Sequence, residues 1–122
     1  MKVIVRITNN FKSEAKPLLK KYKSLSNDLL KLEKDLVANP RLGAPLGQDT
    51  YKIRLKISSK NKGKSGGARV ISLVDSTLIG QIEQTSPEEI TVYLLSIYDK
   101  SDVANIADKE LKDLIKNFKE HS

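Results

Sequence analysis

Two stretches of this sequence, residues 68–74 and 90–98, consist mostly of apolar side chains at consecutive positions. Successive side chains of a β-strand point to opposite faces, so a strand of this composition is apolar on both faces and belongs inside a sheet. Only Arg69 and Ser72 interrupt the first stretch. We therefore expect a sheet with these two strands at its centre, with edge strands and helices supplied by the rest of the chain.

Two other segments show the two-residue period of a strand. Residues 51–57, YKIRLKI, place three cations on one face and three aliphatic side chains on the other. Residues 1–8, MKVIVRIT, alternate in the same way. Residues 78–82 are ambiguous and are compatible with an edge strand, whereas residues 40–47 contain two Pro and two Gly and are expected to form a loop.

Two helical patterns follow the first predicted strand. Residues 9–10 end that strand, and Pro17 within the next segment predicts a helix that begins near Ser13 or is kinked. The second helix has Ser24 or Ser26 as its N-cap. Its apolar stripe is formed by Leu25, Leu29, Leu32 and Leu36 and is widened by Leu30 and Val37.

A third helix is expected after residues 99–101, at the end of the chain. The predicted order is β-α-α-β-β-(β)-β-α, an α+β layer with a mostly antiparallel sheet. A chain of 122 residues fits one domain, here residues 1–122. The apolar face of the last helix comprises Val103, Ala107, Leu111, Leu114, Ile115 and Phe118.

The composition excludes several classes of protein. There is no Cys, which rules out a disulfide scaffold and a thiolate metal site, and the one histidine, His121, is next to last. No cluster of His, Asp and Glu has metal-ligand spacing, and no glycine fingerprint for phosphates is present. Arg6 interrupts the apolar N-terminal segment, and no apolar run is long enough for a membrane span. We expect a cytoplasmic protein without membrane contact, metal or small-molecule cofactor.

The formal net charge is +7, from 22 Lys and Arg against 15 Asp and Glu, and it attracts polyanions such as nucleic acid. Lys52, Arg54 and Lys56 share one face of the strand at 51–57. The alternative is a solvated strand whose charges prevent aggregation. Gly66 and Gly67 can turn backbone N–H groups toward an anion. The loop before them is basic through Lys60, Lys62 and Lys64.

Arg69 is the one charged residue in the strand at 68–74. An arginine in such a strand needs a carboxylate or a phosphate as its partner. Asp75 or Asp99 is the structural alternative to a phosphate. If the strands at 51–57 and 68–74 pair as a hairpin, Arg69 lies near Arg54 or Lys52.

The segment YDKS at residues 98–101 ends the last predicted strand. Side chains at such strand ends are often functional because the sheet fixes their position. Tyr98 and Lys100 are therefore candidates. The alternative is that Ser101 or Asp102 caps the last helix while Tyr98 fills the core.

Taken in order, five segments resemble the toxins of the RelE/ParE superfamily, especially their HigB-like branch. They are NPRLGAPLG (39–47), YKIRLKI (51–57), the basic loop, KSGGARVI (64–71) and YLLSIYDKS (93–101). The resemblance covers the chain from Phe11 to the terminal helix. It implies a twisted antiparallel sheet with two N-terminal helices packed on it and a C-terminal helix. It also implies a bacterial type II toxin-antitoxin system, with a ribosome-associated messenger-RNA endonuclease held silent by a cognate antitoxin.

The resemblance also implies positions for the site. The cations that surround the scissile phosphate in RelE-like members match Lys52, Arg54 and Arg69, and a cation after the last strand matches Lys100. The aromatic acid/base of RelE-type enzymes falls near Ile106, so that role is vacant unless Tyr98 fills it. The histidines of some HigB-type sites have no counterpart. The remaining RNA-binding positions are Lys56, Lys60, Lys62 and Lys64.

The expected chemistry is attack by the 2′-hydroxyl of the RNA on the adjacent phosphate. Arg54 and Arg69 suit bidentate contact with that phosphate. Neighbouring cations favour the neutral amine of Lys52, which would accept the 2′-hydroxyl proton, and Tyr98 or Lys100 would protonate the 5′-oxygen. One alternative is a non-enzymatic ParE-like toxin that binds gyrase. A second is an RNA-binding module without catalysis, against which the scarcity of aromatic residues argues.

Overall fold

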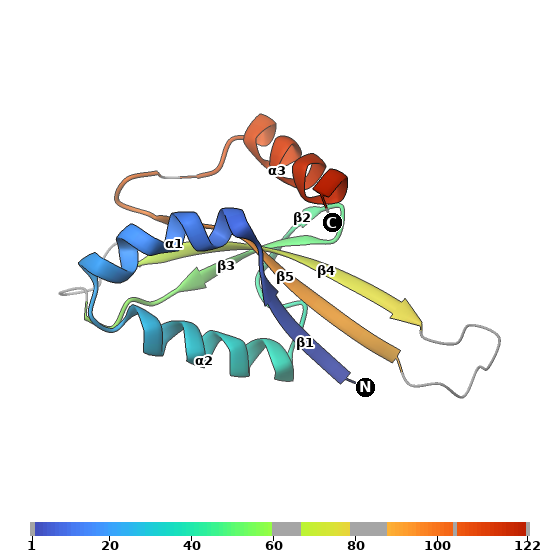
Figure 1. Cartoon of the computed structure of the whole chain (residues 1–122), viewed down its shortest axis with the longest axis horizontal. Coiled ribbons are helices and arrows are strands. Elements are labelled where there is room, and N and C mark those ends of the chain that lie inside the picture. The colour runs from blue at the N-terminus through green and yellow to red at the C-terminus, as the bar shows by residue number, and fades with distance from the viewer. Residues whose placement is uncertain (1, 60–66, 79–87, 104, 122) are drawn as a thin grey trace.

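The computed structural model describes residues 2–59, 67–78, 88–103 and 105–121, which form an α+β architecture (Figure 1). Within these residues, five strands form one mixed sheet and three helices pack on it, so the predicted α+β class is confirmed. Of the ambiguous residues 78–82, only the first is described, as the end of a strand. The elements are β1 (Lys2–Ile7), α1 (Asn9–Lys21), α2 (Leu25–Ala38), β2 (Ala44–Gly47), β3 (Thr50–Leu55), β4 (Ala68–Leu78), β5 (Glu88–Asp99) and α3 (Asp108–His121).

The strand order across the sheet is β1-β5-β4-β3-β2. The two apolar stretches, now β4 and β5, are therefore both interior strands, as predicted. All neighbours pair antiparallel except β1, which runs parallel to β5. The prediction of an antiparallel sheet is wrong at this edge. Parallel neighbours need a long connection, and here α1, α2 and three strands separate β1 from β5.

The two faces of the sheet carry different helices (Figure 1). Neighbouring residues of β4 divide between them: Val70 belongs to an apolar cluster under α1 and α2, and Ile71 to a cluster under α3. This division follows from the alternation of side chains along a strand. We call these the α1/α2 face and the α3 face. The buried members of the α3 cluster are Ile71, Leu73, Leu95 and Ile115.

A bulge interrupts the pairing of β4 with β5. Ser72 lies opposite Leu94, but Ile71 lies opposite Ser96, so Leu95 is an extra residue in β5. Residues five apart in a regular strand point to opposite faces. Because of the extra residue, Tyr93 and Tyr98 instead both pack against the α3 cluster.

Helix α1 begins at Asn9, four residues before the predicted start at Ser13, and includes Pro17. The Oγ1 of Thr8 accepts a hydrogen bond from the N–H of Phe11 at 3.1 Å and caps the helix. The first turns also cover the edge of β5 beyond the end of β1. There, Asn10 Nδ2 donates to the carbonyl of Leu95 (2.9 Å), and Glu14 Oε1 accepts from Ser96 Oγ (2.6 Å) and from the N–H of Ile97 (3.3 Å). These contacts offset the one helical hydrogen bond that proline removes.

Helix α2 buries part of its predicted stripe, namely Leu25, Leu32 and Leu36. Leu30 and Val37 are more than half exposed, so the predicted widening of the stripe is wrong. Ser24 occupies the N-cap position, but its hydroxyl makes no capping hydrogen bond.

Residues 44–47, predicted as part of a loop, form the short strand β2. β2 is an edge strand, where Pro45 is tolerated because its missing N–H is not needed by another strand. Gly43 has φ of +106°, which favours glycine, and a Cβ there would lie 2.5 Å from the carbonyl oxygen of Lys52.

Helix α3 begins at Asp108 rather than directly after β5. Ser101 and Asp102 lie in a turn well before the helix, so neither caps it. Val103 precedes the helix and is 40% exposed, so its assignment to the apolar face is wrong. Ile115 is buried in the α3 cluster, and three other predicted residues pack partly buried against it: Leu111, Leu114 and Phe118.

Candidate nucleic-acid interface

Three of the predicted site residues lie in one row across the sheet. Arg54 of β3 is the register partner of Arg69 of β4, and Arg69 is the partner of Tyr98 of β5. Lys52 lies two residues from Arg54 on the same face, opposite Ile71. Directly opposed residues have Cβ atoms about 4.5–5.5 Å apart. The α3 face therefore brings three cations and a phenol together at one end of the sheet.

Arg69 is held within the sheet, with only 4% of its surface exposed. Its Nη1 donates a hydrogen bond to the carbonyl oxygen of Ala68 at 3.1 Å. Asp75 lies six residues further along β4, roughly 20 Å away, so it is excluded as a partner. Asp99 lies opposite Ala68, the residue that precedes Arg69, so its backbone is close to that of Arg69.

Tyr98 is partly buried against the α3 cluster. Its hydroxyl oxygen is buried and makes no hydrogen bond with any described residue. A buried phenol normally finds a partner, because leaving it unsatisfied costs about 1–3 kcal/mol. The core-filling alternative therefore accounts for the ring of Tyr98 but not for its hydroxyl, which has no hydrogen-bond partner among the described residues.

Lys52 reaches across the α3 face to the segment between β5 and α3. Its Nζ donates a hydrogen bond to Oδ1 of Asn105 at 3.1 Å. Asn105 is not among the predicted site residues, since no local pattern marks an asparagine 53 positions away as a partner of Lys52. The contact fixes the amine of Lys52, which is half-buried.

Arg54 also borders a groove between β3 and α2. β2 pairs with β3 only as far as Lys52, so β2 does not cover the outer edge of β3 at Arg54. A groove of about 230 Å³ lies there, lined by Arg54 and Lys56 together with Asp28, Lys31 and Asp35 of α2. The strand ends at Leu55, so Lys56 lies beyond it and not in the predicted row. Two carboxylates thus partly balance the outer cations, whereas Lys52 and Arg69 do not line this groove.

Asp28 was not predicted as a key residue, yet it joins α2 to the segment after β3. It is buried and accepts hydrogen bonds from Ser24 Oγ (2.7 Å), Ser58 N (3.0 Å) and Ser58 Oγ (2.6 Å). Burial alone raises the pKa of a carboxyl group. The hydrogen bonds from Ser58 and Ser24 and the charge of Lys56 outweigh burial, and the pKa of Asp28 lies below its ordinary value.

Lys100 follows the end of β5 and is half-buried. Its N–H donates to the carbonyl oxygen of Gly67 at 3.0 Å, which places it beside the start of β4. Gly67 has φ of +58°, and a Cβ there would collide with the carbonyl oxygen of Leu55. Lys100 is therefore at the same end of the sheet as Arg69. The predicted residues Lys60, Lys62 and Lys64, with Gly66, lie outside the described residues.

The turn that carries Lys100 is fixed by a buried carboxylate. The hydroxyl of Tyr22 donates to Oδ2 of Asp99 at 2.5 Å, and the N–H of Ser101 donates to Oδ1 at 2.9 Å. Asp99 is 2% exposed. Asp99 was predicted only as a possible partner of Arg69, and no local pattern marks Tyr22, which lies 77 residues earlier, as its partner.

The described residues contain no group of three or more His, Asp or Glu side chains that would hold a metal ion. None of the three described helices is long and apolar enough to cross a membrane. The chain matches no model of a known protein family, and no curated protein matches it. In this arrangement the partly exposed Lys52 and the exposed Arg54 are accessible to a phosphodiester, whereas the Arg69 side chain and the Tyr98 hydroxyl next to them are buried.

Proposed function

We propose that this chain is a toxin of the RelE/ParE type that cleaves messenger RNA on the ribosome without a metal ion. The observation that carries the proposal is the row formed by Arg54, Arg69 and Tyr98, with Lys52 next to it. Cations aligned on neighbouring strands repel one another, and an anion between them removes that cost. The order of elements, with two helices between the first strand and the rest of the sheet, also agrees with the resemblance.

In this proposal the arginines bind the scissile phosphate. Arg69 is buried and already donates to Ala68, so its guanidinium has a fixed orientation. Arg54 is exposed and approaches the phosphate from the edge of β3. The two cations stabilise the extra negative charge of the pentavalent transition state more than that of the bound RNA.

Lys52 and Tyr98 carry the two proton transfers. Asn105 orients the amine of Lys52, which accepts the proton of the 2′-hydroxyl. The hydroxyl of Tyr98, which lacks a partner among the described residues, donates its proton to the 5′-oxygen that leaves. Lys100, whose backbone lies at the same end of the sheet, is the alternative acid in this proposal.

In this proposal the cations of the α3 face are covered by a partner protein when the toxin is not bound to RNA. We propose a cognate antitoxin with an acidic or amphipathic segment that covers the row in the cytoplasm. The net charge of +7 favours such a segment and the ribosome alike.

The gyrase-binding alternative has one observation in its favour. Ile106 stands where RelE-type enzymes carry an aromatic acid/base, and it packs partly buried against the α3 cluster. Tyr98 and Lys100 are then the remaining sources of that proton, and removing the hydroxyl of Tyr98 tests the first of them.

The test is Tyr98→Phe, with Tyr51→Phe as the matched control. Tyr51 packs on the α1/α2 face and lies outside the row. After brief induction, cleavage sites are mapped on transcripts and DNA damage is measured in parallel. Loss of a general acid lowers the cleavage rate roughly 10²–10⁴-fold. Cleavage at the wild-type rate in Tyr98→Phe removes Tyr98 from the mechanism. If the wild-type protein arrests growth with intact transcripts and damaged DNA, the gyrase alternative replaces the proposal.

A further inference from the structure

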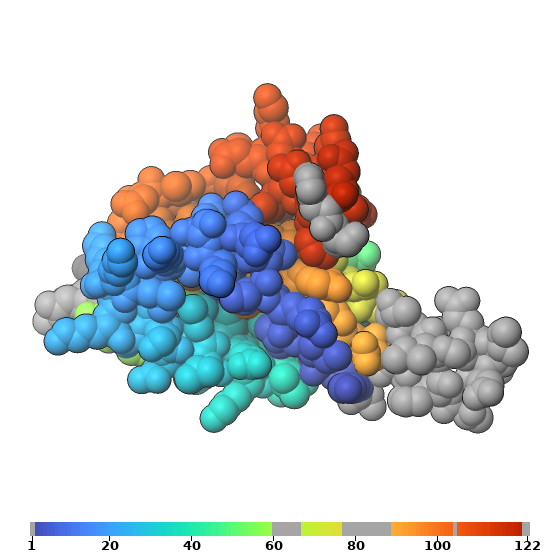
Figure 2. All heavy atoms as spheres, in the orientation of Figure 1, coloured from blue at the N-terminus to red at the C-terminus, as the bar shows by residue number. Residues whose placement is uncertain are grey.

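A second hollow lies away from the cationic row, where the start of α1 meets the C-terminal half of α3. It is a cavity of about 550 Å³. Its walls are residues 6–10 of β1 and α1, Tyr93 of β5, and Leu114, Asn117 and Phe118 of α3. In Figure 2, atoms of β5 are visible between those of α3 and those of β1 and α1. Four elements, β1, α1, β5 and α3, thus border one opening.

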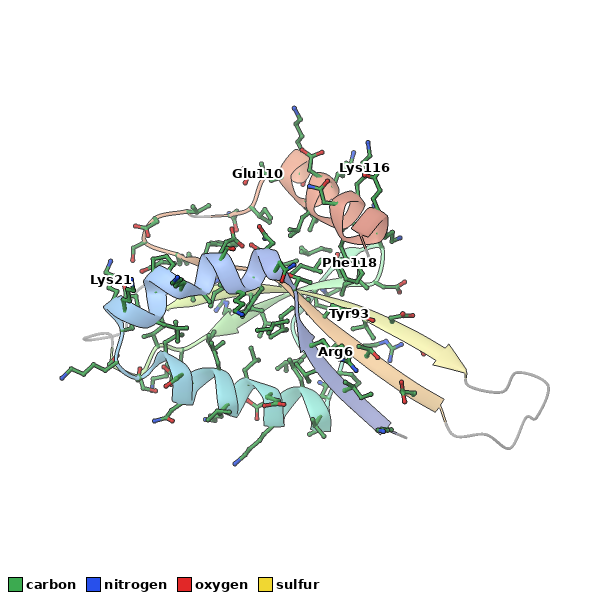
Figure 3. The ribbon with its side chains drawn as sticks, in the orientation of Figure 1. Arg6, Lys21, Tyr93, Glu110, Lys116 and Phe118 are labelled. Atoms are coloured by element: carbon green, nitrogen blue, oxygen red, sulfur yellow. The ribbon has the colours of Figure 1, made fainter. Side chains whose placement is uncertain are left out.

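One wall of this cavity is aromatic. The rings of Tyr93 and Phe118 have centroids 4.7 Å apart and planes inclined at 53° (Figure 3). Leu114 and Ile7 extend the apolar surface, and Ile7 is 56% exposed. An exposed aliphatic residue beside an aromatic wall is a surface that a flat, apolar ligand would remove from water.

The charge at this cavity comes from Arg6. It lies opposite Tyr93 in the parallel pairing of β1 with β5, and its side chain is exposed. Neighbouring polar side chains are engaged, since Thr8 and Asn10 donate to the carbonyl groups of Leu94 and Leu95. Arg6, in contrast, forms no hydrogen bond or ion pair with any residue that the structure describes. Its guanidinium remains available for a planar anion.

We propose that this cavity binds a small aromatic anion. The ring of the ligand packs against Tyr93 and Phe118, and its carboxylate or phosphate accepts the paired N–H donors of Arg6. The cavity volume suits a single small molecule, because such pockets measure about 300–1,000 Å³. This site does not depend on the proposed endonuclease activity, since none of its residues belongs to the cationic row.

Such a ligand would contact α3 and the β1–α1 junction at the same time. Anything that binds only the docked position of α3 stabilises that position. The bound anion would therefore hold α3 against the sheet, which makes the cavity a point at which a metabolite controls that helix.

Fluorescence titration of the full chain with the aromatic sulfonate 8-anilinonaphthalene-1-sulfonate tests the site. We expect one bound molecule per chain and a roughly tenfold weaker Kd in Arg6→Gln, as for the loss of one charge-assisted contact. Arg41→Gln is the matched control, because Arg41 is exposed and does not line the cavity. Equal affinity in wild type, Arg6→Gln and Arg41→Gln overturns the proposal.

Competition identifies the source of the anion. Indole-3-acetate or adenosine monophosphate should displace the dye, the first indicating aromatic carboxylates and the second nucleotides. The uncharged indole-3-ethanol should compete roughly tenfold or more weakly than indole-3-acetate. Displacement by neither anion, or equal displacement by the alcohol, overturns the proposal.

Hydrogen exchange supplies a readout that does not use the dye. With the displacing anion bound, amide groups of α3 at residues 114–118 should exchange more slowly, while those of α2 should not change. Unchanged exchange in α3 at saturating ligand contradicts binding between α3 and β1.

Discussion

The two faces of the sheet differ in how completely they are packed. Among the described residues, the cluster on the α1/α2 face has sixteen buried apolar members, whereas the cluster on the α3 face has four. The buried hydroxyl of Tyr98 and the 550 Å³ cavity both lie on the α3 side. The α1/α2 face therefore supplies most of the apolar burial among the described residues, and the α3 face combines a smaller buried cluster with the cationic row and this cavity.

Because of this difference, we expect truncation of a buried side chain to lower the unfolding free energy by different amounts on the two faces. A buried leucine removed from the larger cluster leaves a cavity that rigid neighbours cannot fill. A side chain removed from under α3 affects a helix with few buried anchors, which can detach locally. Measuring the unfolding free energy of variants on each face tests this difference.

The largest loss is expected for Leu36→Ala in α2. Leu36 is fully buried in the α1/α2 cluster, and such truncations cost about 3–5 kcal/mol of unfolding free energy. Urea denaturation followed by circular dichroism measures this loss. Val37→Ala, at an exposed position of the same helix, is the control. A cost below that of any α3 variant would contradict the division of roles.

A smaller loss is expected for Ile115→Ala in α3. Ile115 is 3% exposed, but the cost is limited by the free energy of detaching α3, so we expect about 2 kcal/mol. Hydrogen exchange should show faster exchange in α3 with little change in β4 and β5. Uniform acceleration throughout the chain would show that both faces unfold as one unit.

Asp28→Asn should cost about 1–2 kcal/mol at neutral pH, because a charge-assisted set of hydrogen bonds is weakened. The folded pKa lies below the ordinary value of 3.8, so the ionised form is the stabilising one. This contribution is complete above that value and is lost as the pH falls through the lower folded pKa. Thermal unfolding between pH 7 and pH 2 should therefore show the mutant and wild type converging at low pH. Asp35→Asn, at an exposed position of α2, should follow the wild type.

The smallest effect on stability is expected for Tyr98→Phe, within about 0.5 kcal/mol of the wild type or slightly stabilising. The substitution removes a buried hydroxyl that has no partner among the described residues and leaves the ring in place. Urea denaturation checks this value. A loss of 2 kcal/mol would show that the hydroxyl has a structural partner and would weaken its proposed role as an acid.

Local patterns in the sequence predicted much of the sheet. Continuous apolar runs identified β4 and β5, and alternation identified β1 and β3, because both signals depend on neighbouring residues. The parallel pairing of β1 and the strand at Ala44–Gly47 were missed, since pairing partners lie far apart in the chain. The predicted start of α1 was wrong because Pro17 disfavours a helix on local grounds, whereas the contacts that the first turns make with β5 arise only in the fold.

The candidate site shows the same limit. The alternation of Lys52 and Arg54 and the position of Arg69 were visible in the sequence, and the condition that brings them together, the antiparallel pairing of β3 with β4, is met. The groups that hold these side chains were not visible. Asn105 is 53 residues from Lys52, and Tyr22 is 77 residues from Asp99, so their hydrogen bonds arise only from the tertiary fold.

The extra residue at Leu95 has a wider consequence. It shifts the phase of β5 by one position, so the aromatic side chain at the cavity and the phenol in the cationic row emerge on the same side. Deleting that single residue would restore the strict alternation of side chains between the two faces along β5. One of the two tyrosines would then turn toward α1 and α2, and the molecule would lose either its hollow or its proton donor.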